Sequence, residues 1–369
     1  MSRVVSQAAE DPRAEAVRRL ARFQDLAAES GHKAFLVSAQ TNIRYLTGFT
    51  GSSGYLLVTP ERAVLYTDGR YDTQAREQTL GIEIAISRNS PLLRVEKDIR
   101  KERIRVSAFE GNRMSFEHYQ RLHALRELRL KPVTGLVERL RAVKSGSEIE
   151  RIRRSVLLNS EAFEQGCRRA RPRWTEMQLA AEIEYQMRLL GAEKTAFDTI
   201  VASGPHAALP HASPRPKSLV HNSLIVIDQG AILDGYTSDM TRMACLGRLP
   251  SQQRQWVRAV LEAQQAAIGK VKAGVKAGSV DRAARQVLQR FGLEQAFKHS
   301  TGHGLGLEIH EAPRIGPGEE QRLLAGMVIT IEPGVYVEGA GGVRIEDVVV
   351  VTRNGCDVLT PTSRQVRSL

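Results

Sequence analysis

The sequence predicts an α/β domain followed by an α+β domain, and the chain length, the order of elements and the composition support this division. The chain has 369 residues, more than one compact core normally holds, so we expect domains at residues 1–140 and 141–369. Strand and helix signals alternate in the first part. In the second part a pair of helices followed by strands occurs twice, which favours two related halves. Hydrophobic and charged fractions of 42% and 25% are typical of a soluble globular protein.

Short apolar runs and amphipathic segments define the elements of the first domain. Asp11 and Pro12 form a helix start, and Gly31 ends that helix. Two of the apolar runs are separated by a short proline-containing turn and are expected to form a hairpin. The expected strands are residues 34–38, 54–59, 63–68, 82–87 and 103–109. The other expected helices are residues 91–101 and 115–127.

Capping signals precede the helices of the second domain. Ser147 with Glu150, and Thr175 with Gln178, match the capping box that starts a helix. The second helix pair is expected after serines, at Ser251 and Ser279. The expected strands are residues 199–204, 223–230, 236–245, 326–337 and 341–352.

Composition also limits the compartment and the partners. No apolar run approaches the roughly 18 residues that cross a membrane, and the N-terminal segment lacks the features of a secretory signal. Three widely spaced cysteines suit a reducing cytoplasm. The net charge of +12 is compatible with nucleic-acid binding, but acids are interleaved with the basic residues of segment 100–173. We therefore expect a cytoplasmic protein with an ordinary basic surface and no nucleic-acid or membrane partner.

Acidic residues within strands are the informative anomaly, because buried carboxylates are costly unless they are paired. Asp228 ends an apolar run, and Asp239 is expected in the next strand. Asp234 and Gly235 provide a turn between them. The spacing of 11 residues (239 − 228) suits a hairpin that places the two carboxylates across from each other.

A second pair of acids repeats this arrangement. Glu332 follows one apolar run and Glu346 lies in the next, with glycines at 339, 341 and 342 between them. The midpoint of positions 332 and 346 is residue 339, inside this glycine-rich turn. The two glutamates are therefore expected to oppose each other on one face of a hairpin.

Four carboxylates on adjacent strand faces repel each other unless cations neutralise them. Hard or borderline divalent metals, bound by oxygen and one imidazole, are the natural solution. His303, in the glycine-rich segment 299–311, is the candidate nitrogen ligand. Two Asp, two Glu and one His can hold two metals about 3.5–4 Å apart.

These residues lie in motifs that resemble the metallopeptidases of the pita-bread fold, which include methionine aminopeptidase, aminopeptidase P and prolidase. The resemblance covers about residues 144–360, and its motifs are VIDQG, GYTSDMTR, STGHGLGLEIHEAP, TIEPGVY and GVRIED. The N-terminal motifs TNIRYLTGFTGSSGYLLV and TDGRY resemble the domain that precedes the catalytic part in aminopeptidase P, prolidase and creatinase. Methionine aminopeptidase lacks that domain, and creatinase lacks this ligand set. By this resemblance the metal ligands are Asp228, Asp239, His303, Glu332 and Glu346.

The resemblance also implies catalytic roles. Glu332 is expected to act as the general base that takes a proton from the attacking water. His310 resembles the histidine that binds the substrate carbonyl and its developing oxyanion. His211 resembles the histidine that contacts substrate near the scissile bond.

Four further residues have supporting or open roles. Arg344 lies two residues before Glu346, on the same strand face, and resembles a residue that orients ligands or substrate. Tyr236 is expected either to contact the site or to pack in the core, and His299 is expected to support the site. His206 departs from the family pattern, in which a smaller amide is expected.

The resemblance implies a dinuclear-metal hydrolase that removes the N-terminal residue from peptides with proline in second position, an Xaa-Pro aminopeptidase. The alternative within the family is an Xaa-Pro dipeptidase (prolidase). A metal-free binding module is the alternative from a different class, and the complete ligand set argues against it. Mn²⁺ is the favoured metal, with Co²⁺ or Zn²⁺ as alternatives, and the family implies a homodimer.

Overall fold

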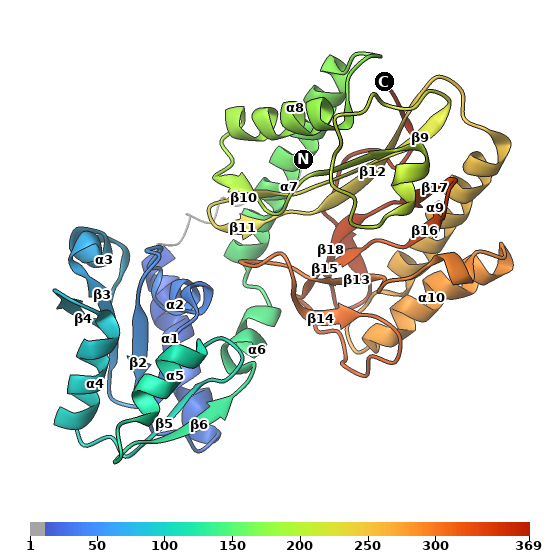
Figure 1. The fold of residues 1–369 in the computed structure, drawn as a ribbon. Coiled ribbons are helices and arrows are strands. Elements are labelled where there is room, and N and C mark those ends of the chain that lie inside the picture. Colours follow the sequence, from blue (N-terminus) through green and yellow to red (C-terminus); the bar gives the residue numbers. More distant parts are fainter. Residues whose placement is uncertain (1–11) are drawn as a thin grey trace, which may run out of the picture. The chain divides into compact units, whose positions relative to one another are not determined.

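The computed structural model describes residues 12–369 (Figure 1). It divides into two compact units, the first ending at Arg141 and the second comprising Ala142–Leu369. Asp11, the predicted helix cap, lies outside the described residues, and the helix is described from Pro12. Within the described part of the chain, no helix has the length and apolar character needed to span a membrane.

The first unit contains a six-stranded sheet in the order β4-β3-β2-β1-β5-β6. The predicted hairpin is confirmed, because β2 and β3 pair antiparallel with Tyr55 opposite Tyr66. The last strand, at residues 129–133, was not predicted and pairs parallel with its neighbour. The strands are β1 Phe35–Val37, β2 Tyr55–Val58, β3 Ala63–Asp68, β4 Glu83–Ser87, β5 Val106–Glu110 and β6 Arg129–Val133.

Helices cover both faces of this sheet. On one face Leu36 and Tyr66 share a core with Val95 and Leu122, which lie on α4 and α5. On the other face Phe23 of α1 meets Phe35 edge-on, with ring centroids 5.2 Å apart. The helices are α1 Pro12–Glu29, α2 Gln40–Thr47, α3 Asp72–Gln78, α4 Pro91–Lys101, α5 Phe116–His123 and α6 Leu136–Ala142. The short helices α2, α3 and α6 were not predicted.

The second unit contains two larger sheets and two small ones. One sheet has the order β20-β12-β9-β8 and the other the order β14-β13-β15-β18-β19. Strands β16 and β17 form a separate hairpin, and β11, β10 and β7 form a small sheet. The strands are β7 Lys194–Thr195, β8 Ile200–Ser203, β9 Ser223–Gln229, β10 Ala231–Leu233, β11 Tyr236–Thr237, β12 Met240–Leu246, β13 Gly302–Gly304, β14 Glu311–Ile315, β15 Val328–Ile331, β16 Gly334–Val337, β17 Gly341–Arg344, β18 Asp347–Val351, β19 Cys356–Val358 and β20 Arg367–Ser368.

Each half of this unit packs a helix pair on its strands, as the repeated element order predicts. Phe163 of α7 and Ile183 of α8 share a core with Ile225 of β9. Trp256 of α9 shares another core with Val349 of β18. Figure 1 shows both helix pairs, α7 and α8 in green and α9 and α10 in orange-yellow, around the strands. Their bounds are α7 Gly146–Arg169, α8 Glu176–Leu189, α9 Ser251–Lys270 and α10 Ala277–Arg290.

The helix starts partly differ from the predicted ones. The Thr175 capping box is confirmed. The other box is formed by Ser145 and Glu148, two residues before the predicted pair, because Ser145 is the last residue with extended backbone. Ser251 is the first residue of α9 rather than its cap. Ser279 lies inside α10, which begins after Lys276.

Candidate active site

The paired register of β15 and β18 brings Glu332 and Glu346 together. Ile331 pairs with Asp347, and beyond the glutamates Gly334 pairs with Arg344. Both pairs have their midpoint at residue 339, so the predicted register is confirmed. The hairpin therefore places the two carboxylates opposite each other.

The two aspartates come together in a different way from the predicted one. Asp228 lies in β9 and pairs with Thr241 of β12, so Asp239 lies diagonal to it and just before the strand. The turn at Asp234 and Gly235 is confirmed, since both residues have positive φ (50° and 79°). This turn joins β10 to β11, a small hairpin between the two longer strands. The insertion shifts Asp239 out of direct register with Asp228.

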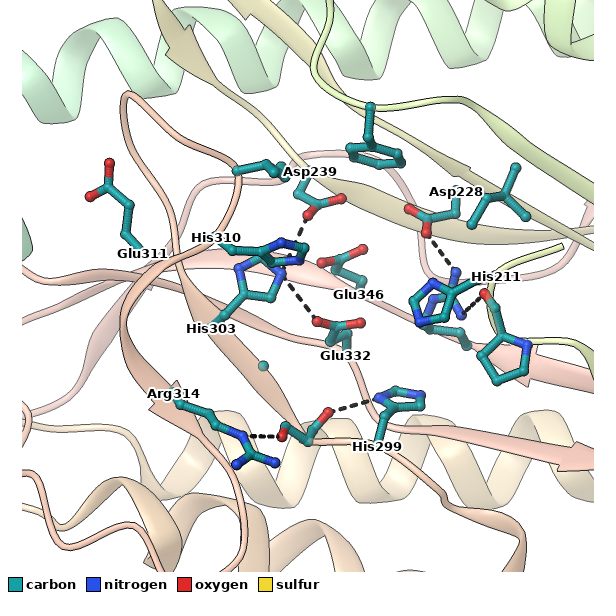
Figure 2. A pocket seen from close by; sticks show the side chains of 17 residues that line it. His211, Asp228, Asp239, His299, His303, His310, Glu311, Arg314, Glu332 and Glu346 are labelled. Atoms are coloured by element: carbon teal, nitrogen blue, oxygen red, sulfur yellow. Dashed lines mark hydrogen bonds and ion pairs between the residues drawn. The ribbon is translucent and has the colours of Figure 1, made fainter. Parts of the chain in front are cut away.

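His303 lies on β13 beside these acids. Its Nε2 atom is 3.6 Å from Asp239 Oδ2 and 3.4 Å from Glu332 Oε1 (Figure 2). Ligand atoms of Asp239, His303 and Glu346 all lie within 4.8 Å of one another. His303 Nδ1 lies 3.0 Å from the Gly304 carbonyl, which can only accept, so Nδ1 carries the proton and Nε2 presents its lone pair to the acids.

The glycines around His303 allow the close packing of this strand. A Cβ atom on Gly302 would lie 2.0 Å from the Thr330 carbonyl oxygen, and one on Gly304 would lie 2.3 Å from the Ala312 carbonyl oxygen. Only glycine therefore lets β13 lie between β14 and β15. The glycine-rich sequence serves to bring His303 against the acids.

Burial governs the protonation of the cluster. It raises the pKa of Glu332 to about 8, although the Arg344 charge opposes this shift. Burial also raises the pKa values of Asp239 and Glu346 well above normal, and the neighbouring carboxylates add to the effect. Burial, with a contribution from His310, lowers the pKa of His303 to about 4. The protein thus presents a neutral imidazole and carboxylates that need added positive charge to ionise.

The donor set fits two divalent cations. Among the described residues, Asp228 Oδ1 and Glu346 Oε1 are buried oxygens without a hydrogen-bond partner. Leaving such oxygens unpaired is costly, and a cation removes that cost. Four carboxylates and one neutral imidazole suit hard or borderline divalent metals.

Arg344 is fully enclosed beneath the cluster. Its Nη2 atom lies 2.5 Å from Asp228 Oδ2, and Nη1 donates to the Tyr336 hydroxyl at 2.6 Å. Its Nε atom donates to Thr241 Oγ1, and the Thr241 hydroxyl donates to Glu346 Oε2 at 2.9 Å. One guanidinium therefore orients Asp228 directly and Glu346 through a threonine. The sequence indicated Arg344 but neither Tyr336 nor Thr241.

His299 is held by this same network. The Tyr336 hydroxyl lies 2.9 Å from His299 Nε2, and His299 Nδ1 lies 2.8 Å from the Ser300 carbonyl. Burial, together with the Arg344 charge, lowers the pKa of His299 to about 4. Its ring is therefore neutral at physiological pH, donating from Nδ1 and accepting the Tyr336 proton at Nε2. His299 thus lies in the cavity lining beside Tyr336, and its supporting role stays a prediction.

The cluster opens into a cavity of about 510 Å³. The histidines assigned to substrate, His211 and His310, both line it, and the His310 ring lies 4.3 Å from that of His303, centroid to centroid. Figure 2 shows the acids and His303 pointing toward one another, with the Glu311 carboxylate directed away. The lining residues are Phe197, Ile200, Pro210, His211, Asp228, Asp239, His299, Ser300, Gly302, His303, Ile309, His310, Glu311, Arg314, Glu332, Arg344 and Glu346.

Tyr236 lies in a core and does not line this cavity. It is buried, and its hydroxyl donates to Glu148 Oε1 at 3.0 Å. The Arg151 guanidinium lies 5.5 Å from the centre of its ring. The structure therefore supports the packing alternative for Tyr236, because its side chain is directed to α7 rather than to the metal ligands.

Arg314 is a cavity residue that the sequence reasoning missed. It lies on β14, four residues after His310, and its side chain is 64% exposed. Its Nε atom donates to Ser300 Oγ at 2.7 Å, which orients the guanidinium at the cavity (Figure 2). The sequence signal that could have indicated it is its position, an arginine shortly after the histidine-containing segment 299–311.

Two family models match the chain. The model described as metallopeptidase family M24 matches residues 150–353, which include all five predicted metal ligands. The chain belongs to metallopeptidase family M24. The model described as the Creatinase/Prolidase N-terminal domain matches residues 19–143. The M24 chain is thus a metal-dependent Xaa-Pro peptidase with the pita-bread fold, as the sequence motifs predicted.

Known relatives resemble the M24 peptidase over nearly its whole length. An Xaa-Pro dipeptidase of Pyrococcus horikoshii is 35% identical over 95% of this chain and 98% of its own. The structure of an Xaa-Pro dipeptidase from Bacillus anthracis has a TM-score of 0.93 at 35% identity, covering 96% of this chain and all of that one. An X-Pro aminopeptidase structure from Thermotoga maritima has a TM-score of 0.87 at 35% identity, covering 94% and 100%.

Proposed function

We propose that this M24 peptidase is an Xaa-Pro dipeptidase, which cleaves a free dipeptide into an amino acid and proline. This dipeptidase function replaces the aminopeptidase function that the sequence motifs implied. Relatives named Xaa-Pro dipeptidase, including those of Pyrococcus horikoshii and Pyrococcus furiosus, favour the change. The observation that carries the proposal is Arg314, a guanidinium at the cavity that holds the metal-ligand cluster.

A dipeptide differs from a longer peptide by the carboxylate next to the scissile bond. Arg314 donates to the neutral Ser300 hydroxyl, and its contact with Glu319 is long, at 3.7 Å. Its exposed side chain retains N–H donors that can form a two-pronged contact with a substrate carboxylate. In a longer peptide an uncharged amide takes the place of that carboxylate, and the charge-assisted contact is lost.

Asp228, Asp239, His303, Glu332 and Glu346 would hold two divalent ions. Such ions, when bound, lower the pKa of a water and polarise the scissile carbonyl. We favour Mn²⁺ for this oxygen-rich set, with Co²⁺ and Zn²⁺ as alternatives.

The side chains in and around the cluster carry out proton transfer, oxyanion stabilisation and substrate contact. Glu332 takes the proton of the attacking water and returns it to the leaving proline nitrogen. His310 donates a hydrogen bond to the carbonyl oxygen as negative charge develops there. His211 contacts the substrate from the opposite part of the lining. An Xaa-Pro bond has no N–H, so this arrangement needs no acceptor for one.

The test compares Ala-Pro with Ala-Pro amide, which lacks the carboxylate charge. We expect kcat/KM to be roughly 10- to 100-fold lower for the amide, the value of one charge-assisted hydrogen bond. Arg314→Met should lower Ala-Pro hydrolysis to the level of the amide and leave the amide unchanged. Arg322→Met, at an exposed arginine outside the cavity lining, is the control. Equal rates for both substrates with the wild-type protein would contradict the proposal.

Three further expectations remain predictions. The resemblance implies a homodimer, and the cysteine content favours the cytoplasm. The interleaved acids favour an ordinary basic surface without a nucleic-acid partner.

A further inference from the structure

Glu176, the first residue of α8, is a completely buried carboxylate with no part in the proposed reaction. Its side chain is 0% exposed. It accepts hydrogen bonds from the Ser203 amide at 2.9 Å and from the Ser203 hydroxyl at 3.0 Å. Arg215 donates to it from its amide, Nε and Nη2 at 3.0–3.1 Å. His206 Nδ1 lies 3.0 Å from its Oε2 atom.

These contacts join the two ends of one loop. Residues 204–215 follow β8 and form the first part of the connection to β9. Glu176 binds this loop at its start through Ser203 and His206, and at its end through Arg215. Backbone bonds from Glu176 and Met177 to the chain around Arg215 add to the closure. The Glu176 side chain thus contacts both ends of the loop, and backbone hydrogen bonds support the same closure.

The middle of this loop reaches the active site. Pro210 and His211 both line the cavity. The Pro210 carbonyl accepts a hydrogen bond from Arg344 Nη1 at 3.0 Å, and the same guanidinium holds Asp228. The position of His211 therefore depends on how firmly the loop is held at its base.

The carboxylate is well suited to this task. Burial opposes its ionisation, but hydrogen bonds from Arg215 and Ser203 hold the pKa of Glu176 below its usual value. An ionised carboxylate accepts at about four lone-pair positions, and the surrounding donors satisfy them all. Such a fully satisfied buried group fixes the geometry of every donor around it.

We propose that Glu176, with Arg215 and His206, forms a clamp that positions loop 204–215 so that His211 faces the substrate. Glu176 is a positioning residue, since it acts through the loop and touches no reacting atom. This role also accounts for His206, because its ring occupies one side of the clamp. The kinetic part of the inference rests on the proposed dipeptidase function, whereas the structural part does not.

The first experiment replaces Glu176 with glutamine, which keeps the shape but turns an NH₂ group toward the donors. Displacing the loop should lower kcat/KM for Ala-Pro by about 10- to 100-fold, with the bound metal content unchanged. Hydrogen–deuterium exchange should accelerate in residues 203–215 and at the start of α8, whose amides contact this loop, and in no other part of the second unit. Glu161→Gln, which breaks the exposed Glu161–Arg168 pair at 3.1 Å, is the matched control and should change neither.

The second experiment uses Arg215, which is 35% exposed and therefore accessible to small cations. Arg215→Ala should show the same fall in kcat/KM and the same faster exchange. Millimolar guanidinium should partly restore both quantities. In the control variant Arg168→Ala, guanidinium should change neither quantity. Rescue distinguishes a missing contact from general damage, and it decides the question even if Glu176→Gln fails to fold.

If exchange in residues 204–215 is unchanged in the Glu176 and Arg215 variants, or is accelerated throughout the second unit, the clamp proposal is wrong. Failure of guanidinium to restore Arg215→Ala would also overturn it. If the wild-type protein does not hydrolyse Ala-Pro, the proposed function fails instead. The exchange and rescue measurements then still test the clamp, because neither requires activity.

Discussion

Arg344 Nη2 lies 2.5 Å from Asp228 Oδ2, so an enclosed guanidinium fixes one carboxylate of the proposed metal centre from below. The same side chain also donates to Tyr336 and Thr241. Its removal would leave the Asp228 charge without its partner and allow the carboxylate to rotate.

Arg344→Met should therefore lower metal affinity or kcat/KM for Ala-Pro by roughly 10- to 100-fold, the usual effect of losing a residue that orients a ligand. Lysine should rescue little, since one ammonium cannot reach all four partners. Metal titration by calorimetry and steady-state kinetics measure the two effects. Arg168→Met is the surface control. Wild-type metal affinity and kinetics in Arg344→Met would refute this role.

The metal-free protein should lose stability as pH rises from 6.5 to about 8. The folded pKa of Glu332 is about 8 against an ordinary 4.5, so the folded state binds the proton more tightly and loses that advantage as pH rises. His299 and His303 act in the opposite direction, but their contribution is complete above the ordinary histidine pKa of 6.5.

Thermal unfolding of chelator-treated protein measures this slope, and we expect Tm to fall by roughly 5 °C over the interval. Glu332→Gln should make the fall in Tm less steep, because glutamine does not titrate, while Asp239 and Glu346, whose pKa values are also raised, still do. Added Mn²⁺ should reverse the trend, since metal competes with protons for the same oxygens. A metal-free Tm that rises over this interval would show that the cluster is already ionised.

His310→Ala should reduce kcat for Ala-Pro by about 10²- to 10³-fold, the effect of removing one oxyanion donor. His310 is outside the ligand set, so metal content measured by mass spectrometry should stay at the wild-type value. Loss of metal from the variant would instead make His310 a ligand.

Tyr236→Phe should leave kcat/KM within about twofold of wild type, because its hydroxyl contacts Glu148 and not the cavity. Leaving the buried Glu148 oxygen without this donor should lower the free energy of unfolding by about 1–3 kcal/mol. Chemical denaturation measures this loss. A large kinetic defect at unchanged stability would return Tyr236 to the active site.

The site elements that the sequence predicted are mostly local in the chain. Glu332 and Glu346 oppose each other because a tight glycine turn fixes the register of the hairpin between them. The predicted pairing of Asp228 with Asp239 was only approximately right, because a second, small hairpin lies between their two strands. Spacing alone does not reveal such an insertion.

The residues that the sequence did not indicate join the site through contacts between separate strands, helices and loops. Tyr336 joins the site through Arg344 and His299, and Arg314 reaches it from the strand after the histidine motif. In the sequence Glu176 is identifiable only as the first residue of a helix. Its contacts with both ends of loop 204–215 are visible only in the folded structure. Such contacts depend on how loops and sheets pack, which periodicity and capping signals do not encode.

The most direct test compares hydrolysis of Ala-Pro and Ala-Pro-Ala by metal-stripped protein with and without Mn²⁺, with the products identified by mass spectrometry. We expect no cleavage without metal, release of alanine and proline from Ala-Pro on adding Mn²⁺, and much slower cleavage of the tripeptide. Faster removal of alanine from Ala-Pro-Ala, with Ala-Pro left intact, would contradict the dipeptidase assignment and establish aminopeptidase action.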